Sequence, residues 1–167
     1  GIIGGDGIDK LYGSELDFLR YDLEEIYRSS GNAAGVEVNL KAHVAQDTYG
    51  NNDLIEGFNN IKGTSLSDQL IGDDNNNIIY GNDGNDTING GSGLDTILGD
   101  IGDDSIQGGN NNDFIDGSIG NDTIAGGFGS DRLTGGGGND FFFYEVADQG
   151  VDIIVDFDGK GKGDDRL

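Results

Sequence analysis

Residues 63–143 read GTSLSDQLI, GDDNNNIIY, GNDGNDTIN, GGSGLDTIL, GDIGDDSIQ, GGNNNDFID, GSIGNDTIA, GGFGSDRLT and GGGGNDFFF, which are nine consecutive nonapeptides without a gap. Position 1 of the repeat is glycine in every line, and position 8 is leucine, isoleucine or phenylalanine. Position 6 is aspartate in eight lines and Asn77 in the remaining one. A fixed short period of this kind indicates a repeat architecture, in which each repeat stacks on its neighbours.

Composition restricts the partners that this chain can have. Its 167 residues include 33 glycines, 9 basic and 32 acidic residues, and the formal net charge is −23. Only 34% of the residues are hydrophobic, which is close to the composition of a disordered chain. We therefore expect one domain whose folding needs something that offsets the acidic self-repulsion. Nucleic acid and anionic membranes are poor partners for such a charge, whereas cations are good ones.

The chain contains no cysteine, proline, methionine or tryptophan. The lack of cysteine rules out disulfides and thiolate metal sites. No stretch is apolar enough to cross a bilayer, so we expect no membrane span. The chain opens in mid-repeat without an initiator methionine or a signal peptide, and we expect it to be a piece of a longer protein.

Each nonapeptide predicts one turn and one short strand. Positions 1–6 are rich in Gly, Asn and Asp, which tolerate the backbone conformations of turns. Positions 7–9 predict a strand with a single inward side chain at position 8. Two repeats then form an 18-residue coil with a strand on each side. Stacked coils form two parallel sheets, in which neighbouring strands are ~4.8 Å apart. At roughly 2 kcal/mol per buried side chain, the inward seam cannot offset the ordering entropy of the array. The expected inward residues are Leu70, Ile79, Ile88, Ile97, Ile106, Ile115, Ile124, Leu133 and Phe142.

The position-6 side chains supply the missing stabilisation if cations lie between them. Turns stack at each edge of the coil, so each position-6 side chain neighbours the one two repeats later. Stacked carboxylates repel one another in a low-dielectric groove, and a cation between each pair makes the column cohesive. One edge carries Asp68, Asp86, Asp104, Asp122 and Asp140, and the other carries Asn77, Asp95, Asp113 and Asp131.

The donor atoms in these turns favour calcium. Carboxylate oxygens and turn carbonyls form an oxygen-only shell, which suits Ca²⁺ better than Mg²⁺. The array contains no His or Cys, which argues against zinc and copper. Pairs of turns two repeats apart predict about seven inter-turn Ca²⁺ sites. The site between Asn77 and Asp95 is expected to be weaker, because an amide replaces one carboxylate.

The lines GNDGNDTIN, GGSGLDTIL and GSIGNDTIA resemble the glycine- and aspartate-rich nonapeptide of the RTX (repeat-in-toxin, hemolysin-type) calcium-binding proteins. The resemblance covers residues 63–143, and GGDGIDKLY at 4–12 is an isolated copy with Asp9 at position 6. It implies an all-β fold, namely a right-handed parallel β-roll with C-terminal capping strands and Ca²⁺ between the turns. It also implies a bacterial protein that leaves the cell by type I secretion and is extracellular or bound to the cell surface.

Residues 1–62 are interpreted as an N-terminal repeat copy followed by an irregular, widened coil or insertion. In 13–21 the repeat loses register, with Asp17 and Leu19 one place early, as if one turn residue were deleted. We interpret this segment, the array and the C-terminal residues as one continuous domain. A small independent subdomain between the isolated copy and the array is the alternative.

Three short elements are expected in the irregular segment. Residues 22–30 could form a helix, because their apolar side chains fall on one helical face. Residues 35–40 predict a half-buried strand with three aliphatic side chains inward. Residues 47–53 predict a turn.

Residues 144–167 are interpreted as a cap and a tail, because the end of a solenoid needs an atypical coil. Residues 141–146 and 151–157 predict strands, and 158–167 predict a frayed end. In the second strand, alternation predicts four inward side chains, Val151, Ile153, Val155 and Phe157.

No group of residues in the sequence indicates catalysis. There is no HExxH helix, GxSxG elbow or phosphate-binding loop. His43 is expected at the surface, and the pair Glu24 and Glu25 lacks the cleft that a glycosidase needs. We therefore predict a non-enzymatic module that folds on binding Ca²⁺ outside the cell and supports the secretion and stability of a larger protein. The alternative is a module that binds an acidic or neutral polysaccharide or a cell surface, and a catalytic domain is disfavoured.

Overall fold

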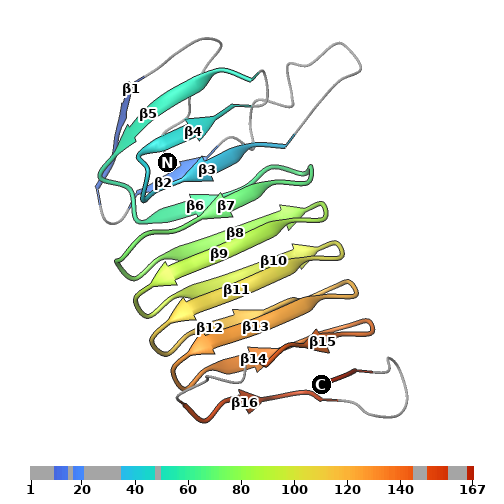
Figure 1. The fold of residues 1–167 in the computed structure, drawn as a ribbon. Helices are drawn as coiled ribbons and strands as arrows, with labels where there is room; N and C mark the ends of the chain where they lie inside the picture. Colours follow the sequence, from blue (N-terminus) through green and yellow to red (C-terminus); the bar gives the residue numbers. More distant parts are fainter. Residues whose placement is uncertain (1–9, 15–16, 21–34, 48–49, 145–149, 158–164) are drawn as a thin grey trace.

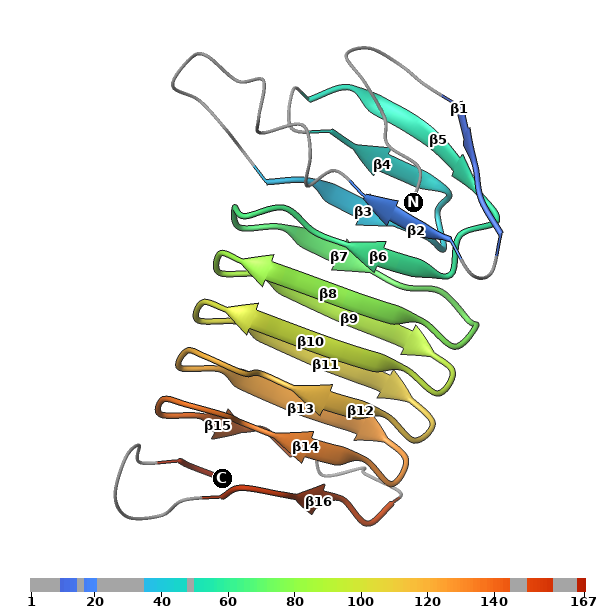
Figure 2. The same cartoon turned by 180° about the vertical axis from the view of Figure 1, so that it is seen from behind.

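A computed structural model describes residues 10–14, 17–20, 35–47, 50–144, 150–157 and 165–167. These residues contain no helix, and their strands form two sheets that lie face to face along the molecule (Figures 1 and 2). The long sheet has nine of the described strands and the short sheet has seven. Among the same residues, no helix is long and apolar enough to cross a membrane.

Strands of the repeat array alternate between the two sheets. The long sheet contains, in spatial order, β1 (Lys10–Tyr12), β5 (Asn52–Glu56), β4 (Val44–Gln46), β3 (Glu37–Asn39), β7 (Gln69–Ile71), β9 (Thr87–Ser92), β11 (Ser105–Asn110), β13 (Thr123–Phe128) and β15 (Phe141–Phe142). The short sheet contains β16 (Ile153–Ile154), β14 (Arg132–Thr134), β12 (Phe114–Asp116), β10 (Thr96–Ile101), β8 (Ile78–Asp83), β6 (Asn60–Lys62) and β2 (Phe18–Arg20).

The register of the array repeats every 18 residues. In the short sheet, Ile97 lies opposite Ile79 on one side and Ile115 on the other, and all three strands run parallel. The long sheet repeats this arrangement in the parallel strands β9, β11 and β13. The prediction of a parallel β-roll with two nonapeptides per coil is therefore confirmed.

The core is the single seam of position-8 side chains between the two sheets. All nine predicted inward residues, from Leu70 to Phe142, are at most 2% exposed. The seam continues into the N-terminal region through further buried side chains such as Leu19, Ile55 and Ile61. One apolar side chain per strand is thus enough to define the interior, as the sequence predicted.

Several strands are longer than positions 7–9 predict. Strands β7, β12 and β14 have the predicted three residues, but β8 to β11 and β13 have six and continue through the next glycine. In β10 the ladder extends to Ile101, which lies opposite Asp83 of β8. The ladder continues because stacked turns have the same shape, so the N–H of Ser92 still reaches the carbonyl of Asp73 at 2.9 Å.

The irregular segment joins the long sheet as a meander. Strand β4, which the sequence did not predict, lies antiparallel to both β3 and β5. The chain reverses before β4 at His43, an exposed residue with a φ of 58°. It reverses again after Asp47, whose carboxylate accepts a 2.8 Å hydrogen bond from the N–H of Asn51. The second turn therefore ends at Asn51, and the rest of the predicted turn belongs to β5.

The shortened repeat keeps its place in the coil. The N–H of Ser14 donates a 3.0 Å hydrogen bond to Asp17, three residues later, whereas Thr64 makes the same bond to Asp68, four residues later. Leu19 pairs with Ile61 and is fully buried. One turn residue is missing, as the sequence predicted. Asp9 and the expected helix at 22–30 lie outside the described residues.

In the C-terminal cap, the side chains that point inward are not the ones that the sequence predicted. Ile153 is 59% exposed, whereas Ile154 pairs with Leu133 and packs against the core. The prediction that Val151, Ile153, Val155 and Phe157 point inward is wrong, because all four are exposed. Strand β16 takes its register from a hydrogen bond between Asp131 and Asp152, and this places Ile154 over the seam. Strand β15 is also shorter than predicted and ends at Phe142.

Candidate metal centre

The position-6 side chains form two buried columns, one along each edge of the roll. Each lies at the end of a turn, immediately before a strand, so its side chain points into the stack of turns. Every predicted member within the described residues is at most 4% exposed: Asp68, Asp86, Asp104, Asp122, Asp140, Asn77, Asp95, Asp113 and Asp131. Burial of so many carboxylates needs compensation, because an isolated ionised group is costly to remove from water.

One carboxylate oxygen of each column member is satisfied by the backbone. Oδ1 of Asp104 accepts a 2.8 Å hydrogen bond from the N–H of Asp86, and Oδ1 of Asp122 accepts the equivalent bond from Asp104. On the other edge, Oδ1 of Asp113 accepts a 2.9 Å hydrogen bond from the N–H of Asp95. These bonds join residues 18 apart and fix each carboxylate in one orientation.

The second oxygen of these carboxylates has no hydrogen-bond donor. Oδ2 is buried and accepts no hydrogen bond in Asp86, Asp95, Asp104, Asp113, Asp122 and Asp140. Buried polar atoms are nearly always satisfied, so a repeated exception of this kind is typical of a cation ligand.

The invariant glycine at position 1 keeps space open beside this oxygen. A Cβ added at Gly99 would collide with Oδ2 of Asp104 and would lie 2.8 Å from the carbonyl oxygen of Gly117 in the next coil. A carboxylate oxygen and a carbonyl oxygen therefore approach the same point from two turns. At position 4, Gly102 has a φ of 146° and approaches the carbonyl of Gly84 too closely for any side chain.

The donors available in the turns are oxygens of carboxylates and of the backbone. Within the described residues, no three His, Cys, Asp or Glu side chains cluster closely enough to hold a metal by themselves. A cation bound here would therefore need carbonyl oxygens in addition to the paired carboxylates. This donor set fits a hard cation such as Ca²⁺, which accepts about 6–8 oxygen ligands in tolerant geometry.

The electrostatics of the columns also favour a cation. Burial, together with the nearby carboxylates of Asp95 and Asp131, raises the pKa of Asp113 to about 8 against the lowering effect of the backbone hydrogen bond. For the same reasons the pKa is about 7 for Asp86 and Asp122. Without a cation, the columns therefore resist full ionisation near neutral pH.

A comparison with protein families matches the described geometry to a known repeat. The RTX calcium-binding nonapeptide repeat matches in four copies, at residues 2–15, 62–97, 90–124 and 116–145. These ranges cover more than half of the chain. The chain belongs to this family. A comparison with curated proteins finds no match.

RTX repeats bind calcium and form a non-catalytic module, so this chain is a calcium-binding β-roll module. The repeats of this family are typical of secreted bacterial proteins.

The structure adds two carboxylates to the RTX columns that the sequence did not indicate. Oδ1 of Asp152 accepts a 2.9 Å hydrogen bond from the N–H of Asp131, and Oδ1 of Asp165 accepts a 3.2 Å bond from the N–H of Asp140. Asp152 could have been found from sequence, because it precedes Ile154 by two residues as in every repeat. Asp165 likewise precedes Leu167 by two residues, but neither carboxylate keeps the 18-residue spacing, because Asp152 follows Asp131 by 21 residues and Asp165 follows Asp140 by 25.

Proposed function

We propose that this module folds when it binds Ca²⁺ outside the cell, and that it thereby supports the secretion and stability of a larger extracellular protein. The observation that carries the proposal is the row of buried Oδ2 atoms without donors along both edges. In five repeats the position-1 glycine lies beside both this oxygen and a carbonyl oxygen of the next coil, so an ion at this position binds two turns together; these are the repeats of Asp86, Asp95, Asp104, Asp113 and Asp122. The proposed ligands are Asp86, Asp104, Asp122, Asp140, Asp95, Asp113 and Asp131.

Binding and folding are coupled because the two columns exist only in the folded roll. In the unfolded chain the aspartates are far apart and hydrated, so Ca²⁺ stabilises the folded state alone. Extracellular calcium modules bind with dissociation constants of roughly 10⁻⁴–10⁻³ M. An affinity in that range leaves the chain unfolded in the cytosol and folds it after export.

Circular dichroism and calorimetry test this proposal together. Without Ca²⁺ and with a chelator, we expect the 167-residue chain at pH 7.5 to lack the β-sheet spectrum. Titration with Ca²⁺ should restore the spectrum with a midpoint near extracellular calcium levels, and Mg²⁺ at the same concentration should not. A spectrum that stays unchanged on chelation would overturn the coupling of binding and folding.

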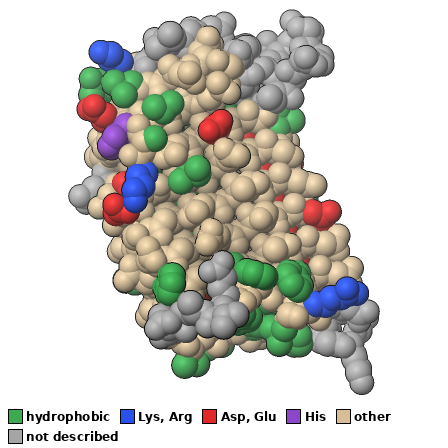
Figure 3. Space-filling view, in the orientation of Figure 1, with side chains coloured by type: hydrophobic (Ala, Val, Ile, Leu, Met, Phe, Trp, Pro, Cys, Tyr) green, Lys and Arg blue, Asp and Glu red, His purple; other side chains and the backbone are tan. Residues whose placement is uncertain are grey.

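A groove on the outer face of the long sheet favours a second function, the binding of a neutral polysaccharide. The groove has a volume of about 650 Å³. Uncharged polar side chains and backbone cover most of the face in Figure 3. The groove is lined by hydroxyl and amide groups, with aromatic rings toward its C-terminal end: Thr87, Asn89, Ser105, Gln107, Thr123, Phe143 and Tyr144.

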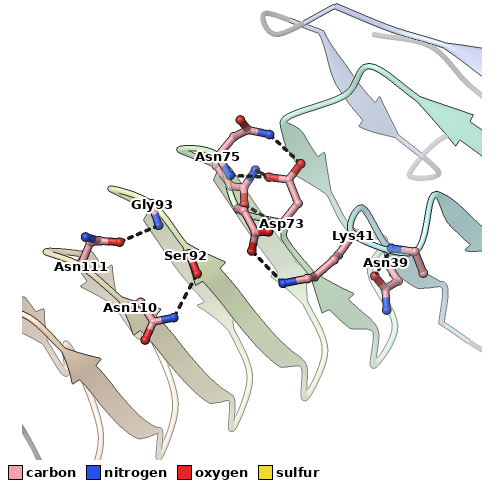
Figure 4. Close-up of polar contacts among 11 residues, drawn as sticks. Asn39, Lys41, Asp73, Asn75, Ser92, Gly93, Asn110 and Asn111 are labelled. Atoms are coloured by element: carbon pink, nitrogen blue, oxygen red, sulfur yellow. Dashed lines mark hydrogen bonds and ion pairs between the residues drawn. The ribbon is translucent and has the colours of Figure 1, made fainter.

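The groove has little charge to attract an acidic polymer. Among the described residues that line it, Lys41 and Asp152 are charged, and Lys41 forms a 2.7 Å ion pair with Asp74. Figure 4 shows this ion pair and the neighbouring bond from Asn110 to Ser92. With a net charge of −23, the module repels polyanions, so we expect neutral chains to be preferred.

Affinity electrophoresis of the Ca²⁺-loaded chain in neutral and acidic polysaccharides tests the second function. Retardation by a neutral polymer that Gln107→Ala weakens would support it. No retardation in any neutral polymer would reject it.

A further inference from the structure

The first coil of the array differs from the later coils in how its position-6 side chains are satisfied. Both carboxylate oxygens of Asp68 accept hydrogen bonds. Oδ2 accepts one of 2.6 Å from the N–H of Thr64, and Oδ1 accepts one of 2.7 Å from the N–H of Val36. The hydroxyl of Thr64 adds a further bond of 2.9 Å to Oδ1. Protein donors therefore surround the oxygen that is left without a donor in Asp86 or Asp104.

Asn77 is satisfied in the same way on the other edge. Its Oδ1 accepts a 2.9 Å hydrogen bond from the N–H of Asp73, and its Nδ2 donates bonds of 2.8 Å to the carbonyl of Asn59 and 3.2 Å to Oδ1 of Asp73. Asn75 also donates to both oxygens of Asp73, as Figure 4 shows. The amide of Asn77 thus supplies donors at the point where the later coils present only acceptors.

The backbone explains why the first coil differs. In the later turns the position-2 residue has a positive φ, as in Asn82 and Asp100 (76° and 72°). Thr64 and Asp73 occupy the same position without a positive φ, and their N–H groups point at the column. The turn therefore has two forms, one that donates hydrogen bonds to the column and one that leaves its oxygens open.

At the C-terminal end of the array, the position-6 carboxylate keeps an oxygen without a hydrogen-bond donor. Oδ2 of Asp140 is buried without a donor, although Asp140 lies in the last regular repeat. Beyond it, Asp165 accepts the hydrogen bond from the N–H of Asp140 that a next repeat would accept. Asp152 has the same relation to Asp131 on the other edge. Each column thus continues one step past the nonapeptides, into the cap.

We propose that the coil at 63–80 needs no calcium, and that the Ca²⁺ sites are displaced by one coil toward the C-terminus. They begin at Asp86 and Asp95 and end beside Asp152 and Asp165. The first coil then provides a hydrogen-bonded start on which the metal-dependent coils stack, and the last ions attach the cap to the array. This proposal rests on the proposed function, because it concerns which residues of this chain hold the ions.

Asn77→Asp is the most discriminating variant, because it replaces the one amide among the position-6 side chains by a carboxylate and leaves the rest of the coil unchanged. Removal of the Nδ2 donor group leaves the new carboxylate oxygen facing two other acceptors, the carbonyl of Asn59 and Oδ1 of Asp73, while the N–H of Asp73 still donates to Oδ1. We expect the number of Ca²⁺ ions bound at saturation, measured by equilibrium dialysis, to rise by one. If the wild-type chain already binds an ion beside Asn77, the variant will change affinity but not number, and that result would overturn the proposal.

Asp165→Asn tests the other end of the displacement. We expect it to lower the number of bound ions by one, and Asp83→Asn, at an exposed position of β8, to leave the number unchanged. Circular dichroism at saturating Ca²⁺ shows that each variant is folded. An unchanged number in folded Asp165→Asn would contradict the proposal, whereas a wild-type chain that binds no Ca²⁺ at all would reject the proposed function instead.

Discussion

The N–H of Asp86 donates a 2.8 Å hydrogen bond to Oδ1 of Asp104, 18 residues later. The same bond recurs from coil to coil on both edges. It uses one oxygen of each carboxylate to fix the stacking of the turns and leaves the other directed at the next coil. The same residues therefore set the spacing of the coils and provide the cation ligands.

Asp104→Asn should have opposite effects on the chain with and without calcium. The amide keeps an oxygen for the backbone bond but removes a buried negative charge. We expect higher stability than wild type in chelator, and in Ca²⁺ a folding midpoint shifted to roughly tenfold higher concentration, which is about 1.4 kcal/mol. Circular dichroism of both chains in chelator, together with Ca²⁺ titrations, measures this. Asp83→Asn, at an exposed position of β8, is the control and should change neither value.

Acid should favour the fold when calcium is absent. Burial and the adjacent carboxylates raise the pKa of Asp113 from 3.8 to about 8 and that of Asp104 from 3.8 to about 6. A raised folded-state pKa gives stability that is complete below the unfolded value of 3.8 and is lost as pH rises through about 6–8.

The calcium-loaded chain should show the opposite trend. Ca²⁺ needs ionised carboxylates, so its affinity should fall as pH drops below that window, with release of protons on binding. Circular dichroism in chelator at pH 4 and pH 8, together with calcium titrations at pH 5.5 and 7.5, measures both trends. More β-structure at pH 8 than at pH 4 in chelator would contradict the expected direction.

Gly99→Ala should weaken calcium-dependent folding, because the added Cβ occupies the space between Asp104 and the carbonyl of Gly117. We expect a loss of about 1–3 kcal/mol from steric strain in a packed site. Gly137→Ala is the matched control, since its added Cβ has no neighbour closer than 3.9 Å, the carbonyl oxygen of Ser118. Urea denaturation in saturating Ca²⁺ compares the two variants, and equal losses would argue against a special role for position 1.

The two faces of strand β10 should respond differently to truncation. Ile97 is fully buried in the seam, and Ile97→Ala should lower the free energy of unfolding by about 2–5 kcal/mol. Ile101, in the same strand, is 51% exposed, and Ile101→Ala should cost much less. Denaturant titration of both variants in Ca²⁺ gives the comparison, and similar losses would show that the seam is not the main apolar core.

Much of the fold and of the candidate site follows from the nonapeptide alone. The inward residues, the 18-residue coil and the two aspartate columns are local consequences of one period, because every coil repeats the same contacts. The nonapeptide did not predict which side chains of the cap point inward. Alternation from Val151 suggested that the odd residues point inward, but the bond between Asp131 and Asp152 sets the opposite facing.

The sequence by itself determined the period, the core side chains and the oxygen chemistry of the edges. Only the tertiary structure decided which members of the columns are already satisfied. Asp68 accepts a hydrogen bond from Val36, which lies 32 residues earlier in an irregular segment, and Asp165 joins a column across 25 residues. Contacts of this kind depend on where the chain returns after a non-repeating stretch. The nonapeptide pattern does not predict where the chain returns to the roll. A backbone N–H or a carboxylate can form a hydrogen bond with a residue at any distance along the sequence, so these partners are known only from the tertiary structure.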